Sequence, residues 1–361
     1  MVRRVVLTTA LFVCLPMAVR GQRTRGLADT LGFARFPGQM ERVIQLCDSL
    51  ERDSLALRER AVWASRRKGW LVAISPHDDY LYAGRVYWHL FRKFSAPRAI
   101  LIGVAHRAAQ WGEANRVLFD SFEQWRGPWG PVTVWDLRDS LLRRLPNDLF
   151  RVCDACHAEE HSLEALIPWM QYRQRNVQIL ALLVPYMHWG RMDTIARALA
   201  RSLAELTRVQ KLVWGEDFVI LISSDAVHYG DDGWGGRNFA PFGVGETGYG
   251  AAVNREYRLL REYLLGSVSP NRLRALLYEL VDPDDVRTYR ITWCGRFSVP
   301  FGLLLSYHLA AELGRNPPEG VLLRYDTSLG LGRLPSSIDG LGVTAPCSLR
   351  HWVGYAAVVY F

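Results

Sequence analysis

The chain has 361 residues, of which 49% are hydrophobic and 22% are charged, and its formal net charge at pH 7 is +8. This composition is ordinary for a globular protein, and the length suits one large α/β domain or two smaller ones. The basic residues are scattered and form no block interleaved with aromatic side chains, so nucleic acid is not an expected partner.

The N-terminus has the layout of a secretory signal peptide. Two arginines precede an apolar run from Val5 to Val19, and the small residue Gly21 follows it. This pattern predicts a signal peptide over residues 1–21 and a mature chain that begins near Gln22, exported to the periplasm or secreted. An uncleaved N-terminal anchor is the alternative. No other stretch has the length of a membrane span, so we expect none after the signal is removed.

Beyond the signal peptide, helical patterning without a turn cluster predicts a helical N-terminal extension over residues 22–69. Strand-like and helix-like segments then alternate to the C-terminus. This alternation predicts an α/β fold, with residues 70–361 forming a single three-layer domain whose mixed, largely parallel central sheet is flanked by helices. We expect helices at 85–94, 159–175, 194–210 and 254–266, loops at 232–250 and 315–342, and a final strand at 353–361.

Residues with metal-binding or acid–base chemistry follow four strand-like apolar runs. WLVAIS leads to His77, AILIGVA to His106, FVILIS to Asp225 and His228, and VRTYRITW to Cys294. Such runs are typical of buried strands, and ligands of open α/β sheets bind beyond the carboxyl ends of the strands. We therefore expect these side chains to converge in one crevice, although they are far apart in the sequence.

Imidazole and thiolate are good ligands for a transition metal, so the pattern suggests a mononuclear metal site. A single histidine in such a place is more often a hydrogen-bonded polar residue near the core than a ligand, and it is the occurrence of four candidate ligands at equivalent positions that favours a site. For the pair Asp225 and His228, a helix beginning after the strand would place both on one face. Asp225 would then orient the imidazole for acid–base work, or it would simply cap that helix.

Two other segments leave alternatives open. Glu159-Glu160-His161-Ser162-Leu163-Glu164 is expected to open a helix, where its acids could cap the N-terminus or serve catalysis. Asp78 and Asp79 follow His77 and could support it by hydrogen bonds. The remaining histidines have no supporting context, and we interpret them as structural: His89, His188, His308 and His351.

The segment Cys153-Asp-Ala-Cys156-His157 matches the pattern for covalent c-type haem. A redox or structural disulfide and a chance match are the alternatives, and because nothing else in the chain indicates electron transfer, we predict that no haem is attached. The cysteines that follow the signal segment are odd in number, so at least one stays unpaired in an oxidising compartment. A metal-bound Cys294 would be that residue.

Six motifs occur in order from about Trp70 to Phe361: PHDDYLYAG, GVAHR, EEHSLEALIPWMQY, LISSDAVHYG, TWCGRFSVPFGLLL and VGYAAVVYF. Together they resemble the Memo family, which includes AmmeMemoRadiSam system protein B and the eukaryotic mediator of cell motility. The resemblance implies a fold similar to that of class III (LigB-type) extradiol dioxygenases. The chain has Asp78-Asp79 where the family usually has Ala-Gly.

The resemblance also implies a site. His77, His106 and Cys294 match the family's metal-binding positions, while Asp225 and His228 line the same pocket. The expected function is a non-haem oxidoreductase that uses iron or copper, with zinc a further candidate, and that takes a small-molecule or peptide ligand in the metal pocket. The alternatives are a non-catalytic peptide- or metal-binding module and a zinc-dependent hydrolase. An open coordination position would favour an enzyme over a closed structural site.

Overall fold

The computed structural model describes residues 23–64, 69–335 and 337–361. The predicted signal peptide, residues 1–21, lies outside this range. In the described part of the chain, no helix combines the length and the hydropathy needed to cross a membrane.

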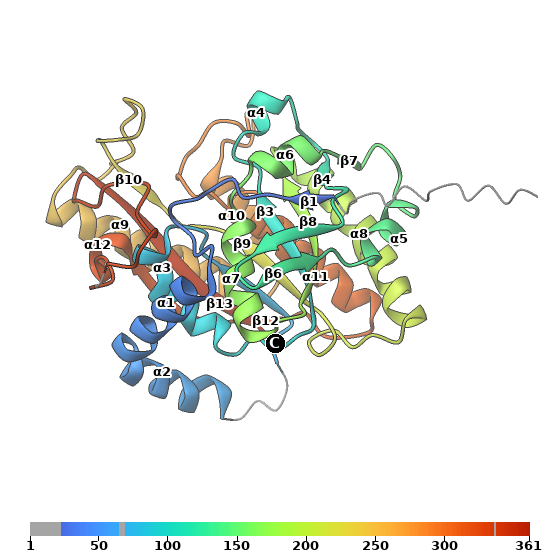
Figure 1. Ribbon diagram of the computed structural model, residues 1–361. Coiled ribbons are helices and arrows are strands. Elements are labelled where there is room, and N and C mark those ends of the chain that lie inside the picture. The colour runs from blue at the N-terminus through green and yellow to red at the C-terminus, as the bar shows by residue number, and fades with distance from the viewer. Residues whose placement is uncertain (1–22, 65–68, 336) are drawn as a thin grey trace, which may run out of the picture.

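The elements alternate as expected along most of the chain (Figure 1). The strands are β1 Thr24–Arg25, β2 Val72–Ser75, β3 Arg98–Val104, β4 Val117–Phe119, β5 Gln124–Gly127, β6 Gly130–Thr133, β7 Phe150–Val152, β8 Gln178–Val184, β9 Val219–Ser223, β10 His228–Gly230, β11 Gly266–Ser267, β12 Glu319–Thr327 and β13 His351–Tyr360. The helices are α1 Pro37–Leu50, α2 Arg52–Arg58, α3 Tyr80–Phe91, α4 Ala108–Trp111, α5 Leu137–Leu142, α6 Asp154–Glu159, α7 Ile167–Arg173, α8 Trp189–Val209, α9 Glu246–Leu259, α10 Pro270–Leu280, α11 Ser298–Glu312 and α12 Ser328–Leu331.

The central sheet is mixed and has the order β11-β12-β13-β2-β9-β3-β8-β4-β7, with β10 paired to β13. Its middle strands β2, β9, β3 and β8 run parallel. β12 and β13 pair antiparallel with their neighbours, and β4 is antiparallel to β8 but parallel to β7. The predicted fold class is therefore confirmed. In the parallel part, β2, β3 and β9 all end at the same edge, which is where the predicted site residues follow them.

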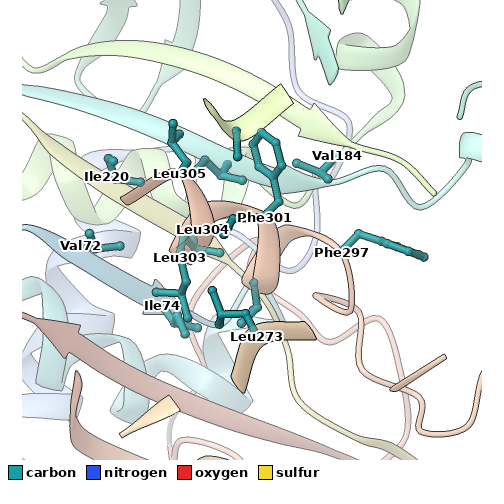
Figure 2. Close-up of a cluster of buried hydrophobic side chains, with 14 of the residues drawn as sticks. Val72, Ile74, Val184, Ile220, Leu273, Phe297, Phe301, Leu303, Leu304 and Leu305 are labelled. Carbon is teal, nitrogen blue, oxygen red and sulfur yellow. The ribbon is translucent and has the colours of Figure 1, made fainter. Parts of the chain in front are cut away.

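Alternate side chains of the central strands enter two separate cores, as the pleat requires. In β2, Val72 and Ile74 face the layer of α8, α10 and α11, whereas Ala73 faces the layer of α1, α3 and α7. Nearly the whole circumference of α11 is buried, because it lies between the sheet and α8. Figure 2 shows the first core, where the α11 side chains lie among those of the sheet and α10: Val72, Ile74, Val184, Ile220, Leu273, Phe301, Leu303, Leu304 and Leu305.

The N-terminal extension is helical only from Pro37 onward, so the prediction of a wholly helical segment is wrong for its first part. Thr24–Arg25 instead forms β1, which pairs in parallel with β5 of a small second sheet. The buried guanidinium of Arg25 forms an ion pair with Glu164 and donates to the carbonyl of His157. The extension is thus fastened to the domain, and α1 packs on α3.

Three other predicted elements differ. The expected loop 315–342 contains β12, which pairs with β13 along its length. The expected loop 232–250 ends early, because α9 begins at Glu246. Residues 286–293 form no sheet strand: four consecutive side chains there, 287–290, are exposed, and only isolated bridges connect the segment to its neighbours.

Candidate metal centre

The carboxyl ends of β2, β3 and β9 bring the predicted site residues together. His77 follows β2 after Pro76, and His106 follows β3. Their rings lie edge to face with centroids 5.2 Å apart, and Cys294 Sγ is 3.3 Å from His106 Nε2. All three side chains line one hollow of about 160 Å³. The expected convergence of residues distant in sequence is present.

His77 is held in one tautomer by its neighbours. The Ser223 hydroxyl donates to the carbonyl of Ser162 at 2.6 Å, so its oxygen accepts from His77 Nδ1–H at 2.8 Å. In the neutral ring this leaves a lone pair on the buried Nε2, which has no hydrogen-bond partner in the structure. Nε2 instead faces Asp225 Oδ2 at 3.3 Å. Two facing acceptors require a cation between or beside them, which can be a proton or a metal ion.

Asp225 supports His77, and this differs from its predicted role. Its Oδ1 accepts from the backbone N–H of His77 at 2.9 Å. Residues 228–230 form β10 and not a helix, so Asp225 and His228 do not share a helical face, and no hydrogen bond joins these two residues. Burial raises the pKa of Asp225 to about 6, against the lowering effect of His77. Burial lowers the pKa of His77, but Asp225 and Cys294 together outweigh burial, and the pKa is raised.

His106 is oriented by Glu160. The buried carboxylate accepts from the backbone N–H and from Nδ1–H of His106, both at 2.8 Å. The second bond assigns one proton to Nδ1. Burial lowers the pKa of His106, but Glu160 and Cys294 raise it well above its ordinary value, so without a bound ion Nε2 also carries a proton, directed at Cys294. Burial alone would raise the pKa of Glu160, but His106 lowers it far below its ordinary value, so the carboxylate is charged. This arrangement is typical of metal-binding histidines.

Cys294 is placed by a backbone contact rather than by a strand. Val227 and Trp293 form an isolated antiparallel bridge, and the buried carboxyl of Glu256 accepts from Val227 N–H and Trp293 Nε1–H. Cys294 Sγ lies 3.6 Å from His228 Nε2. Burial would raise the pKa of the thiol, but the two nearby imidazoles lower it well below its ordinary value. The sulfur is therefore a thiolate, the form that binds metals.

His228 faces the same hollow from β10. Its Nδ1 donates to the carbonyl of Thr292 at 3.3 Å, which leaves Nε2 directed toward Cys294. Burial lowers the pKa of His228, but Cys294, Asp225 and Asp78 together outweigh burial and raise the pKa to about 9. His228 thus retains a proton at neutral pH beside the thiolate.

His161 is a site residue whose role the sequence left open. The helix expected to begin at Glu159 begins later: α6 ends at Glu159, a 3-10 turn covers Glu164–Leu166, and α7 follows from Ile167. The intervening turn stacks the His161 ring on His106, with centroids 4.8 Å apart and planes 6° apart. Glu160 belongs to this turn and binds His106, so it serves the site rather than capping a helix.

Two overlapping groups of three residues could hold a metal ion, each with ligand atoms within 4.8 Å of one another. One is His77, His106 and His161, and the other is His77, Asp225 and Cys294. The three predicted ligands are thus divided between them, with His77 common to both. Once neutral, the imidazoles of His77 and His106 would each offer Nε2, which together with a thiolate suits a transition metal.

The structure also bears on the remaining hypotheses about cysteines and histidines. Cys153 and Cys156 form a disulfide, which is the alternative that the structure supports for the haem-like motif. Among the described residues, Cys47, Cys294 and Cys347 are free. His351, interpreted as structural, lines the hollow and stacks on Trp234 with centroids 3.9 Å apart.

A model of the Memo-like protein family matches residues 55–337, which is most of the chain. The chain therefore belongs to the Memo-like family, as its motifs indicated. It is 31% identical over 199 residues to a MEMO1 family protein of Ignicoccus hospitalis, an alignment that covers 54% of this chain and 66% of that one. It is 24% identical over 276 residues to a MEMO1 family protein of Pyrococcus horikoshii, covering 74% and 84%, respectively. The alignment to the Ignicoccus protein thus spans just under two thirds of that relative.

Proposed function

We propose that this protein is a metal-dependent oxidoreductase whose ion is bound by His77, His106 and Cys294. The observation that supports this most directly is the buried, unpartnered Nε2 of His77, which faces the Asp225 carboxylate at 3.3 Å. A divalent ion beside Nε2 would satisfy both groups. The thiolate of Cys294 and Nε2 of a neutral His106 would supply two further donors in the same hollow.

The donor set favours iron or copper over hard ions, because imidazole and thiolate are soft or borderline ligands; zinc also accepts both. When bound, iron or copper would supply one-electron chemistry and a coordination position for a small molecule. His161 and Asp225 stand beside the three ligands and are the residues able to complete the coordination.

The residues of the chain itself would handle protons. Without a bound ion, burial lowers the pKa of His228, but Cys294, Asp225 and Asp78 together raise it to about 9. The Nδ1 of His228 is held by Thr292, so Nε2 is the atom that can give a proton to a ligand in the hollow or take one from it. Asp225 would keep the His77 ring in place.

The test is oxygen uptake by protein loaded with ferrous or cupric ion, in the presence of a panel of phenols, thiols and small organic acids. We expect oxygen uptake with wild type. His228→Ala is expected to keep the wild-type metal content but lose turnover. His188→Ala, which alters an exposed histidine outside the site, is expected to match wild type in both metal content and oxygen uptake. If uptake by loaded wild type never exceeds that of Cys294→Ser, the oxidoreductase proposal is wrong. Ester or amide hydrolysis by the zinc form alone would favour the hydrolase.

We also propose that the protein is exported and cleaved near Gln22. The Cys153–Cys156 disulfide supports this, since such bonds persist mainly in oxidising compartments. N-terminal sequencing of protein from its native source is expected to begin at or near Gln22. A sequence that begins at Met1 would reject cleavage.

A further inference from the structure

A larger groove continues outward from the metal-binding hollow. One cavity of about 610 Å³ opens onto His106, His228 and Cys294. A second of about 460 Å³ adjoins it and shares its wall residues Phe239, Tyr289 and Thr292. We call the two together the outer groove. Its size suits a small organic molecule with one end at the metal-binding residues.

The outer groove and the inner hollow are lined by different charged residues. The lining of the outer groove, as far as the structure describes it, has four arginines and no carboxylate: Arg237, Arg255, Arg290 and Arg296. The described lining of the inner hollow has no arginine or lysine, and besides five histidines it contains four aspartates: Asp29, Asp78, Asp79 and Asp225. A ligand that spans both would therefore place its negative group outward, away from the aspartates.

Arg296 is the most buried of the four arginines. Its side chain is only 8% exposed, its Nε has no hydrogen-bond partner, and Nη1 donates to the carbonyl of Trp293 at 3.2 Å. In the described part of the chain it forms no ion pair. The equally buried Arg138 pairs with Asp120 at 3.1 Å, and the buried Arg25 pairs with Glu164. A buried guanidinium without a counter-ion is unfavourable, so an anion is expected to bind there.

The walls of the outer groove favour a flat ligand. Trp234, Phe239, Tyr289 and Trp293 contribute aromatic rings. The guanidinium of Arg296 lies 3.9 Å from the centre of the Tyr289 ring, which leaves the in-plane N–H groups as its way of binding a ligand. Those N–H groups match the geometry of a carboxylate.

We propose that the outer groove binds an organic carboxylate with a flat, unsaturated body, and that Arg296, assisted by Arg237, holds the carboxylate. As a statement about the substrate, this rests on the proposed oxidoreductase function. The carboxylate would fix the orientation of the ligand so that its other end reaches His228 and the metal-binding residues. Arg296 and Arg237 are then specificity-determining residues.

Binding is tested with benzoate, its neutral isostere benzamide, cinnamate and inorganic phosphate, through the fluorescence of Trp234 and Trp293 and by calorimetry. The titrations use the protein as purified and again after chelation of its metal. We expect saturable binding of benzoate or cinnamate at millimolar concentration or below. Benzamide is expected to bind about ten-fold more weakly or worse, because it lacks the charge that a guanidinium recognises.

Arg296→Gln and Arg237→Gln are each expected to weaken carboxylate binding about ten-fold while leaving benzamide binding unchanged. Arg237 is exposed, so its variant tests the proposal even if Arg296→Gln fails to fold by circular dichroism. Arg201→Gln, on the exposed face of α8, is the matched control. Equal affinity for benzoate and benzamide, binding of phosphate alone, no binding of either carboxylate, or wild-type affinity in Arg237→Gln would each overturn the proposal.

The result of this binding test can be distinguished from the result of the test of the proposed oxidoreductase function. Carboxylate binding that persists after chelation and depends on the arginines supports the outer groove even if no metal-dependent turnover exists. Turnover without any preference for a carboxylate refutes the groove proposal and leaves the oxidoreductase intact.

Discussion

The carboxylate of Glu160 binds His106 twice, through the backbone N–H and through Nδ1–H, each at 2.8 Å. This pair of hydrogen bonds sets both the position and the tautomer of the imidazole. Glu160 is only 2% exposed and also accepts from the backbone N–H of Ser162 at 2.9 Å, so the turn after α6 is built around it. The orientation of a predicted metal ligand thus depends on a residue of the turn after α6, 54 positions away in the sequence.

Replacing Glu160 by Gln is expected to weaken metal binding about 10–100-fold, because the amide cannot accept both hydrogen bonds as a charged group does. The measurement is a competition titration against a chelator of known affinity. Glu159→Gln is the control, since that neighbour is largely exposed and contacts Arg107 and Trp111 instead. Equal affinities of the Glu160 variant and the control would show that His106 needs no such support.

Gly295→Ala is expected to displace the adjacent Cys294. A Cβ at position 295 would lie 2.1 Å from Ser224 Oγ and 2.4 Å from Ser224 Cβ, so the backbone must move. We expect a loss of about 1–3 kcal/mol in the free energy of unfolding, together with weaker metal binding. Gly250→Ala, where an added Cβ meets nothing within 4 Å, should leave both unchanged or raise stability slightly. Unaltered metal binding in Gly295→Ala would show that the close packing at Gly295 does not position Cys294 for the metal.

Glu256 makes stability depend on pH. Burial raises the pKa of its carboxyl to about 7, well above the ordinary value near 4.5. The folded state then binds a proton that the unfolded state has released, so this carboxyl makes the folded state less stable as pH rises between these two values. The stability of Glu256→Gln relative to wild type is expected to increase by roughly 3 kcal/mol from about pH 4 to about pH 8. Denaturant unfolding at both pH values measures this, and a constant difference would rule out the raised pKa.

The disulfide predicts an intact mass two hydrogens lower than that of the protein reduced in denaturant. Both sulfurs of the haem-like motif are in the Cys153–Cys156 bond, and the ring of His157 is buried, with Nε2 donating to the carbonyl of Leu118. We therefore expect no covalent haem. Visible absorption that survives acid–acetone extraction would show the opposite.

The sequence was sufficient to predict the placement of His77, His106 and Asp225, because uninterrupted apolar runs identify buried parallel strands and their ends. The sequence also predicted that Cys294 lies near them, but the reason, a strand that ends just before Cys294, is wrong. Residues 286–293 are not a sheet strand, and the contact of Trp293 with Val227 depends on the distant Glu256. The alternating buried residues of β12, at 323, 325 and 327, were a signal that could have identified this strand.

Local sequence patterns could not predict which side chains contact one another within the site. Asp225 was expected to orient His228, its neighbour in sequence, but it binds His77, 148 residues away. The stacking of His161 on His106 likewise depends on a turn whose shape Glu160 fixes through a long-range contact. Periodicity reports which face of an element is buried, and it does not report which polar atoms meet across the crevice.

The most direct test of the proposed metal centre is elemental analysis of the protein purified from its native compartment, in parallel with His77→Ala, His106→Ala and Cys294→Ser. We expect about one equivalent of a transition metal in wild type, and its loss in each of the three variants, because removing one ligand also removes the geometry of the others. His188→Ala and Cys347→Ser, which alter residues that the proposal does not use as ligands, should retain the wild-type content. A wild-type level of bound metal in His77→Ala would contradict the account.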